Sequence, residues 1–432
     1  MTAYKSQSDH DLQNEVRLLE KRVKDIQGQH LKLNMTRGKP NPDQLSLSSK
    51  LANCLDSDDF RSEDGTDCRN YGGLEGLMEI RRLFADLLKT KPDKVLVLGP
   101  SSLTIMYDML VRCLLNTLPD GERPWIHEKK IKFLCPVPGY DRHFYATESL
   151  GIEMIPVMMT EHGPDMDRVE ALVSSDPQIK GLWAVPQYSN PQGITYSDET
   201  CHRLSAMKTA APDFRLFWDH AYVVHHLYPD DPSDIPDIVS LCELNGHPNR
   251  VFEFASTSKI TWAGSGVACL VSSDENLVFI RHVLAAQMIG PDKMNQLRHA
   301  RFLKSKETVE ALMRQHADIL RPKFEKVDEI LSRELSDLAI CSWQKPKGGY
   351  FFSLDLLPGT ASETVSLAKS CGIELTPAGS TWPYRKDPDD SNLRLAPSFP
   401  TLPEITAATE VLTVCIRLAA ARKIMADRQN NL

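Results

Sequence analysis

The feature that most constrains this chain is a repeated alternation of amphipathic helical segments with short apolar runs between residues 74 and 271. Each run is a few residues long and is not interleaved with polar residues, which is typical of strands that are buried on both faces. Seven strands are predicted in this way, at residues 95–98, 131–135, 153–157, 180–185, 214–218, 250–254 and 267–271. Helices are predicted between them at residues 74–88, 103–115, 142–150, 166–174 and 198–209.

This order of elements predicts an α/β domain with a mostly parallel seven-stranded sheet and helices on both faces. The strand at 267–271 follows the strand at 250–254 too closely for a helical crossover, so we expect it to run antiparallel. Asp165 and Ser197 directly precede helical segments and are expected to cap them.

The pattern changes beyond residue 275. A long helical region at 292–334 precedes a glycine- and aromatic-rich segment at 348–355, and short strands and helices complete the chain. These later elements are expected at residues 363–371 (helix), 373–375 and 392–396 (strands) and 404–421 (helix). We therefore predict three parts: residues 1–50, a helix (11–30) and a loop that pack with the small domain; 51–310, the large α/β domain; and 311–432, a smaller α+β domain.

Charge and composition exclude several classes of protein. The 432 residues include 50 Lys and Arg against 58 Asp and Glu, a net charge of −8, so a nucleic-acid partner is not expected. No apolar stretch approaches the roughly 20 residues of a membrane span, and the N-terminus does not resemble a signal peptide. Ten scattered cysteines without CxxC spacing argue against a disulfide framework or a metal site. We expect reduced thiols and a cytoplasmic protein.

Two polar segments directly follow predicted strands and carry groups suited to chemistry. In Ser256-Thr-Ser-Lys259, a lysine in a buried polar pocket can lose its proton and form a Schiff base, and the hydroxyls can hold a phosphate. A solvated loop lysine is the alternative. Asp219 follows the strand at 214–218 and is expected to face the ligand crevice of an open sheet, unless it only caps a helix.

Three further segments have the same character. Gly99-Pro-Ser-Ser102 joins a strand to a helix and offers hydroxyls and free N–H groups to an anion, or else a simple cap. Asn190 stands in Tyr188-Ser-Asn-Pro-Gln-Gly193, which offers an amide to a ligand or forms a plain turn. Arg394 lies in an apolar strand, where it suits either a substrate carboxylate or a structural ion pair.

Taken together, the order and spacing of these segments resemble the fold-type I pyridoxal-phosphate enzymes, the aspartate aminotransferase superfamily, over residues 34–420. The motifs that carry the resemblance are Tyr71-Gly-Gly-Leu-Glu-Gly76 with Arg81, Pro138-Gly-Tyr140, Asn190-Pro-Gln-Gly193, Asp219-His-Ala-Tyr222, Ser256-Thr-Ser-Lys259 and Arg394. Three others are similar to a bacterial subgroup with aspartate aminotransferase activity: Thr36-Arg-Gly-Lys-Pro40, the segment 256–264, and Asp292-Lys-Met-Asn-Gln-Leu-Arg298.

The resemblance implies the cofactor pyridoxal 5'-phosphate and a role for each matching residue. Lys259 would hold the cofactor as a Schiff base and then carry a proton. Asp219 would pair with the pyridine nitrogen, and Asn190 and Tyr222 would bind the ring hydroxyl. Tyr140 would stack on the ring. Lys259, Asp219 and Tyr222 are thus the predicted catalytic residues.

The same resemblance assigns the phosphate and the substrate. The phosphate would be held by four hydroxyls, those of Ser101, Ser102, Ser256 and Ser258. Tyr71 would reach the phosphate of the neighbouring subunit, so the active unit would be a homodimer. Arg394 would bind the substrate α-carboxylate, with Gly38 and Asn190 near the substrate.

Two features depart from the pattern of the superfamily. Many relatives place an arginine on the phosphate just after the lysine, but residues 260–266 contain none, so the phosphate charge must be balanced otherwise. The residue that binds the distal carboxylate of aspartate has no clear match, and Arg37, Lys39 and Lys293 are the candidates, the last from the partner subunit.

The sequence thus favours transamination between aspartate and 2-oxoglutarate by a ping-pong mechanism. The nearest rival keeps the cofactor but acts on another amino acid, as an aromatic or branched-chain transaminase, a β-lyase or a decarboxylase; Trp262 and Trp382 could line its pocket or simply pack in the core. A cofactor-binding transcription regulator would need a DNA-binding module before residue 34. A metal hydrolase would have to use Asp219, His220, His225 and His226, which lack ligand spacing.

Overall fold

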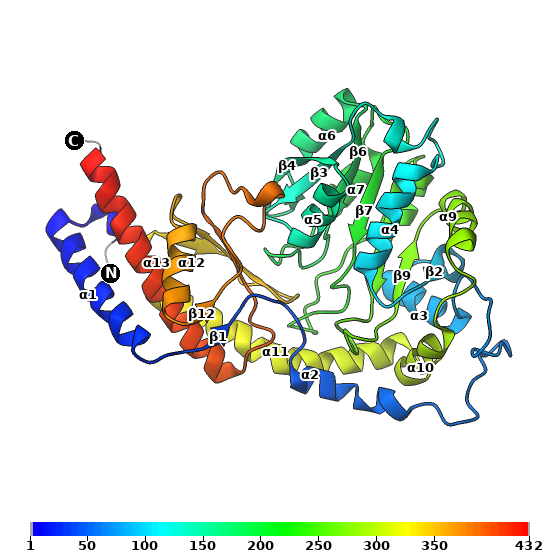
Figure 1. Ribbon diagram of the computed structural model, residues 1–432, viewed down its shortest axis with the longest axis horizontal. Helices are drawn as coiled ribbons and strands as arrows, with labels where there is room; N and C mark the ends of the chain where they lie inside the picture. Colours follow the sequence, from blue (N-terminus) through cyan, green and yellow to red (C-terminus); the bar gives the residue numbers. More distant parts are fainter. Residues whose placement is uncertain (1–2, 431–432) are drawn as a thin grey trace.

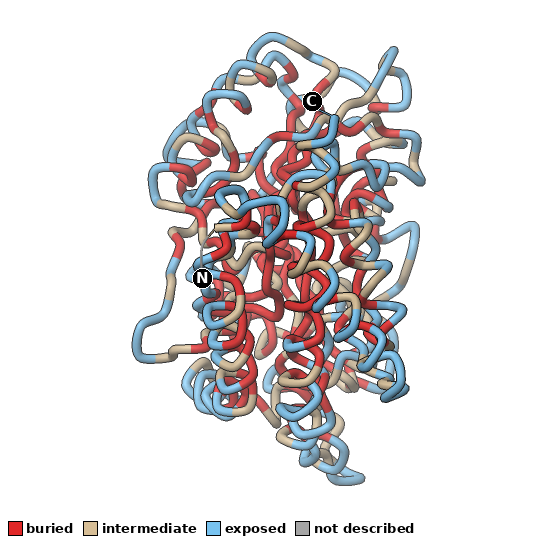
Figure 2. Tube along the Cα trace, turned by 90° about the vertical axis from the view of Figure 1, so that its left-hand side faces the viewer, coloured by how far each residue is buried: buried red, intermediate tan, exposed pale blue. Residues whose placement is uncertain are grey.

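The computed structural model describes residues 3–430, and these form one large sheet and two small sheets (Figure 1). The large sheet and its helices occupy one side of the molecule, and the two small sheets lie on the other side. The long helix α11 (Lys306–Leu335) runs from one side to the other. Buried segments concentrate in the interior of the molecule, and exposed segments surround them (Figure 2).

The large sheet contains all seven predicted strands, in the order β2-β9-β8-β7-β6-β3-β4-β5. Strands β4, β3, β6, β7 and β8 pair in parallel, whereas β9 is antiparallel to both of its neighbours, as expected for residues 267–271. Its strands are β2 (Val95–Val97), β3 (Lys132–Val137), β4 (Glu153–Thr160), β5 (Gly163–Pro164), β6 (Ile179–Ala184), β7 (Arg215–Asp219), β8 (Val251–Ser256) and β9 (Ala268–Val271).

Helices cover both faces of this sheet, which confirms the predicted layered α/β architecture. One face packs against α4 (Ser102–Leu115), α5 (Asp141–Ser149) and α9 (Asp274–Gln287). The other face packs against α3 (Met78–Leu88), α6 (Met166–Ser175), α7 (Asp198–Ala206), α8 (Ile238–Leu244), α10 (Lys293–Leu303) and the start of α11. As predicted, Asp165 and Ser197 cap α6 and α7.

The apolar runs form strands because the sheet buries both of its faces. Every residue of β6 and of β7 is buried. Successive side chains of a strand point to opposite faces, so Leu182 and Leu216 join one apolar cluster and Trp183 and Phe217 join the other. A continuous apolar run therefore has a place for each of its side chains.

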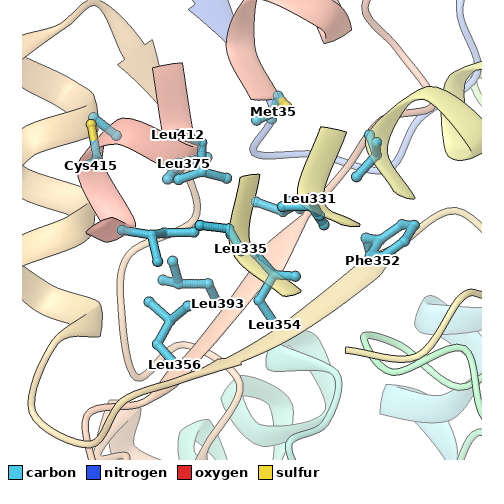
Figure 3. Close-up of a cluster of buried hydrophobic side chains, with 14 of the residues drawn as sticks. Met35, Leu331, Leu335, Phe352, Leu354, Leu356, Leu375, Leu393, Leu412 and Cys415 are labelled. Atoms are coloured by element: carbon cyan, nitrogen blue, oxygen red, sulfur yellow. The ribbon is translucent and has the colours of Figure 1, made fainter. Parts of the chain in front are cut away.

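The smaller domain has its own apolar core (Figure 3). An antiparallel sheet of order β10-β11-β13 and a parallel pair β1-β12 pack with helices from both ends of the chain. These elements are α1 (Asp9–Gln27), β1 (Leu33–Asn34), β10 (Cys341–Trp343), β11 (Phe352–Leu356), α12 (Ala361–Ser370), β12 (Ile373–Glu374), β13 (Asn392–Leu395) and α13 (Leu402–Asn430). Helix α2 (Pro42–Leu47) instead packs against α11. Short 3-10 helices are η1 (Tyr4–Ser6), η2 (Ser49–Asn53), η3 (Pro92–Lys94), η4 (Trp125–His127), η5 (Pro248–Arg250), η6 (Ser336–Leu338) and η7 (Pro383–Arg385).

The first helix packs against the last one. Arg417 of α13 donates to Glu15 of α1 at 2.6 Å, and Arg422 donates to Glu20 at 2.7 Å. The N-terminal segment thus contacts the smaller domain, although the domain boundaries at residues 50 and 310 stay a prediction.

Three local predictions are corrected by the structure. The helix expected from residue 74 begins at Met78, because the preceding glycines 72, 73 and 76 have positive φ angles. The helical region at 292–334 is two helices, separated at Lys304, where φ is 58°. The sheet also has an eighth strand, the two-residue β5, which is too short for its pattern to be recognised.

All ten cysteines are free thiols in this structure. Within residues 3–430, no helix combines the length and apolar character that crossing a membrane requires.

Candidate active site

The carboxyl ends of β3, β6, β7 and β8 lead into residues that line a single cavity with an empty volume of about 450 Å³. Seven of the residues singled out in the sequence line this cavity: Gly38, Ser102, Tyr140, Asn190, Asp219, Tyr222 and Lys259. The remaining lining residues are Leu103, Met106, Val185, Ala221 and Phe351. Segments that lie far apart in the sequence therefore meet because parallel strands end at the same edge of the sheet.

Asp219 is the last residue of β7, and no helix begins there, so it does not cap a helix. Its Oδ2 lies 3.0 Å from Nε2 of His143, whereas its buried Oδ1 has no hydrogen-bond partner among the described residues. The imidazole of His143 stacks on Trp183, with 4.2 Å between the ring centres. Because buried acceptors normally receive a hydrogen bond, Oδ1 fits the protonated ring nitrogen of a bound pyridine.

Lys259 lies just beyond β8 and places its amine in the same cavity. Burial lowers the pKa of the Lys259 amine, and the negative charge of Asp219 partly opposes this shift. The amine nitrogen lies 4.7 Å from the ring centre of Tyr222. A lysine with a lowered pKa is neutral more often and can attack a carbonyl carbon, which fits the formation of a Schiff base with an aldehyde.

Tyr140 and Tyr222 are kept as neutral phenols. Burial raises the pKa of both hydroxyls, and it raises that of Tyr222 well above the usual value. The Tyr140 ring meets His143 edge-on, with ring centres 4.9 Å apart. Both tyrosines can therefore donate a hydrogen bond to a ligand at neutral pH.

The four predicted phosphate hydroxyls lie around the N-terminus of α4 and the end of β8. The hydroxyl of Ser256 donates to that of Ser258 at 3.2 Å, and the Ser258 hydroxyl donates to the carbonyl of Pro100 at 3.3 Å. Ser101 occupies the N-cap position of α4, but its side chain makes no capping hydrogen bond, and Ser102 is the first helical residue. The helix N-terminus also offers free N–H groups, so the arrangement suits an anion.

Arg394 is buried on β13 and bridges the small domain to the large one. Its Nη1 donates to Oδ1 of Asp141 at 2.7 Å and to Oδ1 of Asn190 at 3.3 Å. The guanidinium carbon lies 5.0 Å from the ring centre of Phe351, and Nε has no partner in the part of the chain that the structure describes. The guanidinium thus retains donors for a substrate carboxylate, although the ion pair with Asp141 is also present.

Eight predicted residues are not among those that line the cavity: Ser101, Ser256, Ser258 and Arg394, described above, and Tyr71, Arg37, Lys39 and Lys293. Tyr71 is 82% exposed, and Arg37 and Lys39 are exposed, with the Lys39 amine 3.9 Å from the ring centre of Phe399. Lys293 is buried and donates to the carbonyl of Gly72 at 2.5 Å, so it holds the loop that carries Tyr71. The assignment of Arg37, Lys39 or Lys293 to a distal carboxylate stays a prediction.

The adjacent histidines serve separate structural contacts. Nδ1 of His220 lies 2.9 Å from Glu253, Nε2 of His225 lies 3.4 Å from the Lys259 carbonyl, and Nδ1 of His226 lies 2.6 Å from the Tyr188 hydroxyl. Among residues 3–430, no group of three His, Cys, Asp or Glu side chains is arranged to hold a metal ion.

The two tryptophans considered for a substrate pocket lie outside the cavity. Trp262 donates its indole N–H to the Leu45 carbonyl at 3.1 Å, and Trp382 is buried in the apolar cluster on one face of the large sheet. Both tryptophans therefore fit the packing alternative better than a role in a substrate pocket.

Sequence reasoning missed His143, Asp141 and Phe351. His143 follows Tyr140 by three residues, and this spacing places both side chains on the same side of α5. That periodicity was the available signal for His143. Asp141 and Phe351 gave no such signal, because their importance comes from contact with Arg394, which lies more than 40 residues away in the sequence from either.

The fold and the site together define the class. A lysine and a carboxylate meet in one cavity at the carboxyl edge of an open α/β sheet, with hydroxyls at a helix N-terminus and an arginine from a second domain. This is the arrangement of a fold-type I aminotransferase, and the chain is an enzyme of that class.

The chain belongs to the aspartate aminotransferase family, whose model, described as aspartate amino-transferase, matches residues 7–428. It is 49% identical over 403 residues to an aspartate aminotransferase of Corynebacterium glutamicum, with 93% of each chain covered. A solved structure described as an aspartate transaminase from the same species superimposes with a TM-score of 0.96 at 46% identity and covers 98% of this chain and 99% of that one.

The fold extends to more distant enzymes. An α-aminoadipate aminotransferase from Thermus thermophilus, solved in complex with N-(5'-phosphopyridoxyl)-L-leucine, has a TM-score of 0.71 at 21% identity, covering 91% of this chain and 93% of that one. At this identity the likeness shows the shared fold alone.

Proposed function

We propose that this aminotransferase uses pyridoxal 5'-phosphate to exchange an amino group between aspartate and 2-oxoglutarate by a ping-pong mechanism. The observation that carries the proposal is one cavity in which a lysine with a lowered pKa and a carboxylate oxygen without a partner lie together. The names of the Corynebacterium relatives support aspartate as the substrate.

The residues present fit the cofactor in charge and in hydrogen bonding. Asp219 would bind the pyridine nitrogen, Asn190 and Tyr222 would bind the ring hydroxyl, and Tyr140 would lie on the ring face. The phosphate would accept from the hydroxyls of Ser101, Ser102, Ser256 and Ser258, and the N-terminus of α4 would offset part of its charge. When bound, pyridoxal phosphate supplies an electron sink for the bonds at the substrate Cα.

The chain's own groups would then bind the substrate and move its proton. Arg394 would bind the α-carboxylate, with Asn190 holding the guanidinium from the other domain. The neutral Lys259 amine would remove the proton from Cα of the amino-acid substrate in the first half-reaction. In the second half-reaction it would deliver a proton to Cα of the amino acid that forms. Gly38 allows close packing here, since a Cβ at this position would lie 2.4 Å from the ring of Phe351.

We further propose a cytoplasmic homodimer in which Tyr71 reaches the phosphate held by the partner subunit. Support comes from the 82% exposure of this aromatic side chain and from Lys293, which holds its loop. Mixing Tyr71→Ala and Lys259→Ala chains tests the shared site. A mixed dimer has one of its two sites with both native residues, and random pairing of the two chains makes half of the dimers mixed. We therefore expect the mixture to recover about a quarter of the native activity. No recovery in dimers proven to be mixed would contradict the sharing.

The direct test of the proposed function is the visible absorption spectrum of the purified protein. We expect a band from the lysine-bound cofactor that is lost on addition of aspartate and returns on addition of 2-oxoglutarate. A band that responds only to another amino acid would keep the cofactor and overturn the substrate. Absence of a band even after pyridoxal phosphate is supplied would overturn both.

A further inference from the structure

A second cavity, with an empty volume of about 950 Å³, lies at the amino ends of β7 and β8, the edge opposite to the active site. Two arginines line it: Arg215 begins β7 and is 1% exposed, and Arg250 ends η5 and is 5% exposed. The other lining residues are Asp120, Lys208, Thr209, Pro212, Phe214, Gly246, His247 and Pro248.

Arg250 is a buried cation without an acidic partner. Its Nη1 donates to the carbonyls of Ser205 at 2.7 Å and Leu204 at 3.3 Å. No carboxylate of the described residues comes within 4.0 Å of its guanidinium, and Lys208 at the rim has no partner there either. Burial lowers the pKa of Arg250 to about 10, and the positive charge of Arg215 contributes to this shift.

Arg215 is only weakly compensated. Its Nη2 donates to the Pro119 carbonyl at 2.6 Å, and the closest acidic oxygen, Oδ2 of Asp120, lies 3.9 Å away. Its Nε is buried and finds no acceptor among the residues described. Both arginines therefore satisfy part of their hydrogen bonding with backbone carbonyls, but these neutral groups do not cancel two charges.

Buried charges in proteins are ordinarily paired, because removing an unpaired ion from water is strongly unfavourable. The charged lining groups are Lys208, Arg215 and Arg250 against Asp120, which leaves an excess of two positive charges with His247 neutral. The planar fork of a guanidinium matches the oxygens of a phosphate, and charge-assisted bonds to phosphate are among the strongest in proteins.

We propose that this cavity binds a phosphate group, either as free phosphate or as the terminal phosphate of a small metabolite. The site is separate from the active site, since Arg215 and Asp219 stand at opposite ends of β7, about 13 Å apart at 3.3 Å per residue. The proposal goes beyond transamination and does not depend on it.

Calorimetric titration of the cofactor-loaded protein with inorganic phosphate, and separately with ribose 5-phosphate, at constant ionic strength tests the site. We expect one site per chain. Tighter binding of ribose 5-phosphate would indicate a metabolite, and equal or weaker binding would indicate free phosphate. The absorption band of the cofactor should not change, because the active site is not occupied.

Variants locate the binding. Arg250→Met should weaken it at least about tenfold and Lys208→Glu by a similar factor, since the first removes a positive charge from the cavity and the second replaces one at its rim with a negative charge. Lys91→Met is the matched control, because Lys91 is exposed, lies outside the cavity and has no side-chain partner within the described chain. Arg250 also binds two carbonyls, so if Arg250→Met does not fold, Lys208→Glu decides, because Lys208 is exposed.

Three results would overturn the proposal. The first is the absence of binding for both ligands. The second is binding that Lys208→Glu leaves unchanged. The third is binding that alters the cofactor band, which would place the anion in the active site instead.

Discussion

The two ends of strand β7 carry buried residues of opposite charge, Arg215 and Asp219, and their surroundings differ. At the carboxyl end, Asp219 lies against His143 and lines a cavity formed by distant segments, and its second oxygen has no partner within residues 3–430. At the amino end, Arg215 donates mainly to carbonyls of nearby loops. A charge at the carboxyl edge is thus positioned by contacts with distant segments and keeps an oxygen for a ligand. A charge at the amino edge also forms hydrogen bonds with the carbonyls of neighbouring loops.

The substitution with the strongest predicted effect is Lys259→Ala, in the cavity at the carboxyl edge of the sheet. Lys259→Ala removes the only amine that lines this cavity within the described residues, so turnover should fall by at least about 10⁴-fold. The melting temperature should stay within a few degrees, because the lysine side chain makes no hydrogen bond to any residue that the structure describes. Steady-state assays and thermal unfolding measure the two quantities, with Lys91→Met as the control. Retained activity would mean that another group performs the chemistry.

The second effect tests whether the charge of Asp219 matters or only its position. Asp219→Asn keeps the size of the side chain and removes its charge, so we expect a loss of about 10³-fold in kcat and weaker cofactor binding. The matched control is Glu253→Gln on the adjacent strand β8, a buried carboxylate 2.9 Å from His220 that does not line the cavity. Its activity should stay within about threefold. Equal losses in both variants would show a general effect of buried charge.

The third prediction tests whether Asp141 orients the Arg394 guanidinium or competes with the substrate carboxylate for it. Asp141 and Asn190 both accept from Nη1, so we infer that they orient the guanidinium while Nε and Nη2 face the substrate. Asp141→Asn should then raise KM for amino acids about tenfold and leave kcat within about twofold. Asp167→Asn, another acidic residue in the first turn of a helix, is the control. A lower KM would instead show that Asp141 competes with the substrate carboxylate.

The smallest effect concerns pH. Because burial lowers the pKa of Lys259, its amine loses its proton below pH 10.5, and only the neutral amine reacts. The rate at which the cofactor-free protein takes up pyridoxal phosphate should therefore rise with pH, with a midpoint below that of free lysine. Stopped-flow absorbance measures this rate. Asp219→Asn should move the midpoint lower still, since the Asp219 charge favours the ammonium form; a higher midpoint would contradict the assigned interaction.

Much of the fold followed from local patterns. The apolar runs at residues 180–185 and 214–218 became β6 and β7 because both faces of the sheet are covered, and the short link before residue 267 correctly indicated the antiparallel β9. The helix expected from residue 74 failed in its first turn because Gly76 there adopts a positive φ, as do Gly72 and Gly73 just before it. Helix ends depend on such local backbone states, which periodicity does not reveal.

The residues of the active site were also predicted only in part. Lys259, Asp219 and Asn190 were found because each follows a strand, and parallel strands end at a common edge. Two contacts that position the predicted residues were not found. His143 contacts Asp219 across 76 residues of sequence, and Asp141 contacts Arg394 across 253.

Local patterns in the sequence therefore predicted which segments form strands and which residues stand at their ends, because burial and strand direction act locally along the chain. Which charges meet depends on how these elements pack in three dimensions. The strand order β8-β7-β6-β3 brings α5 beside Asp219, and the packing of two domains brings Asp141 to Arg394. The same packing leaves Arg250 at the other edge without an acidic partner among the described residues. Contacts between distant segments depend on how all the strands and helices pack together, and no local sequence pattern encodes that packing.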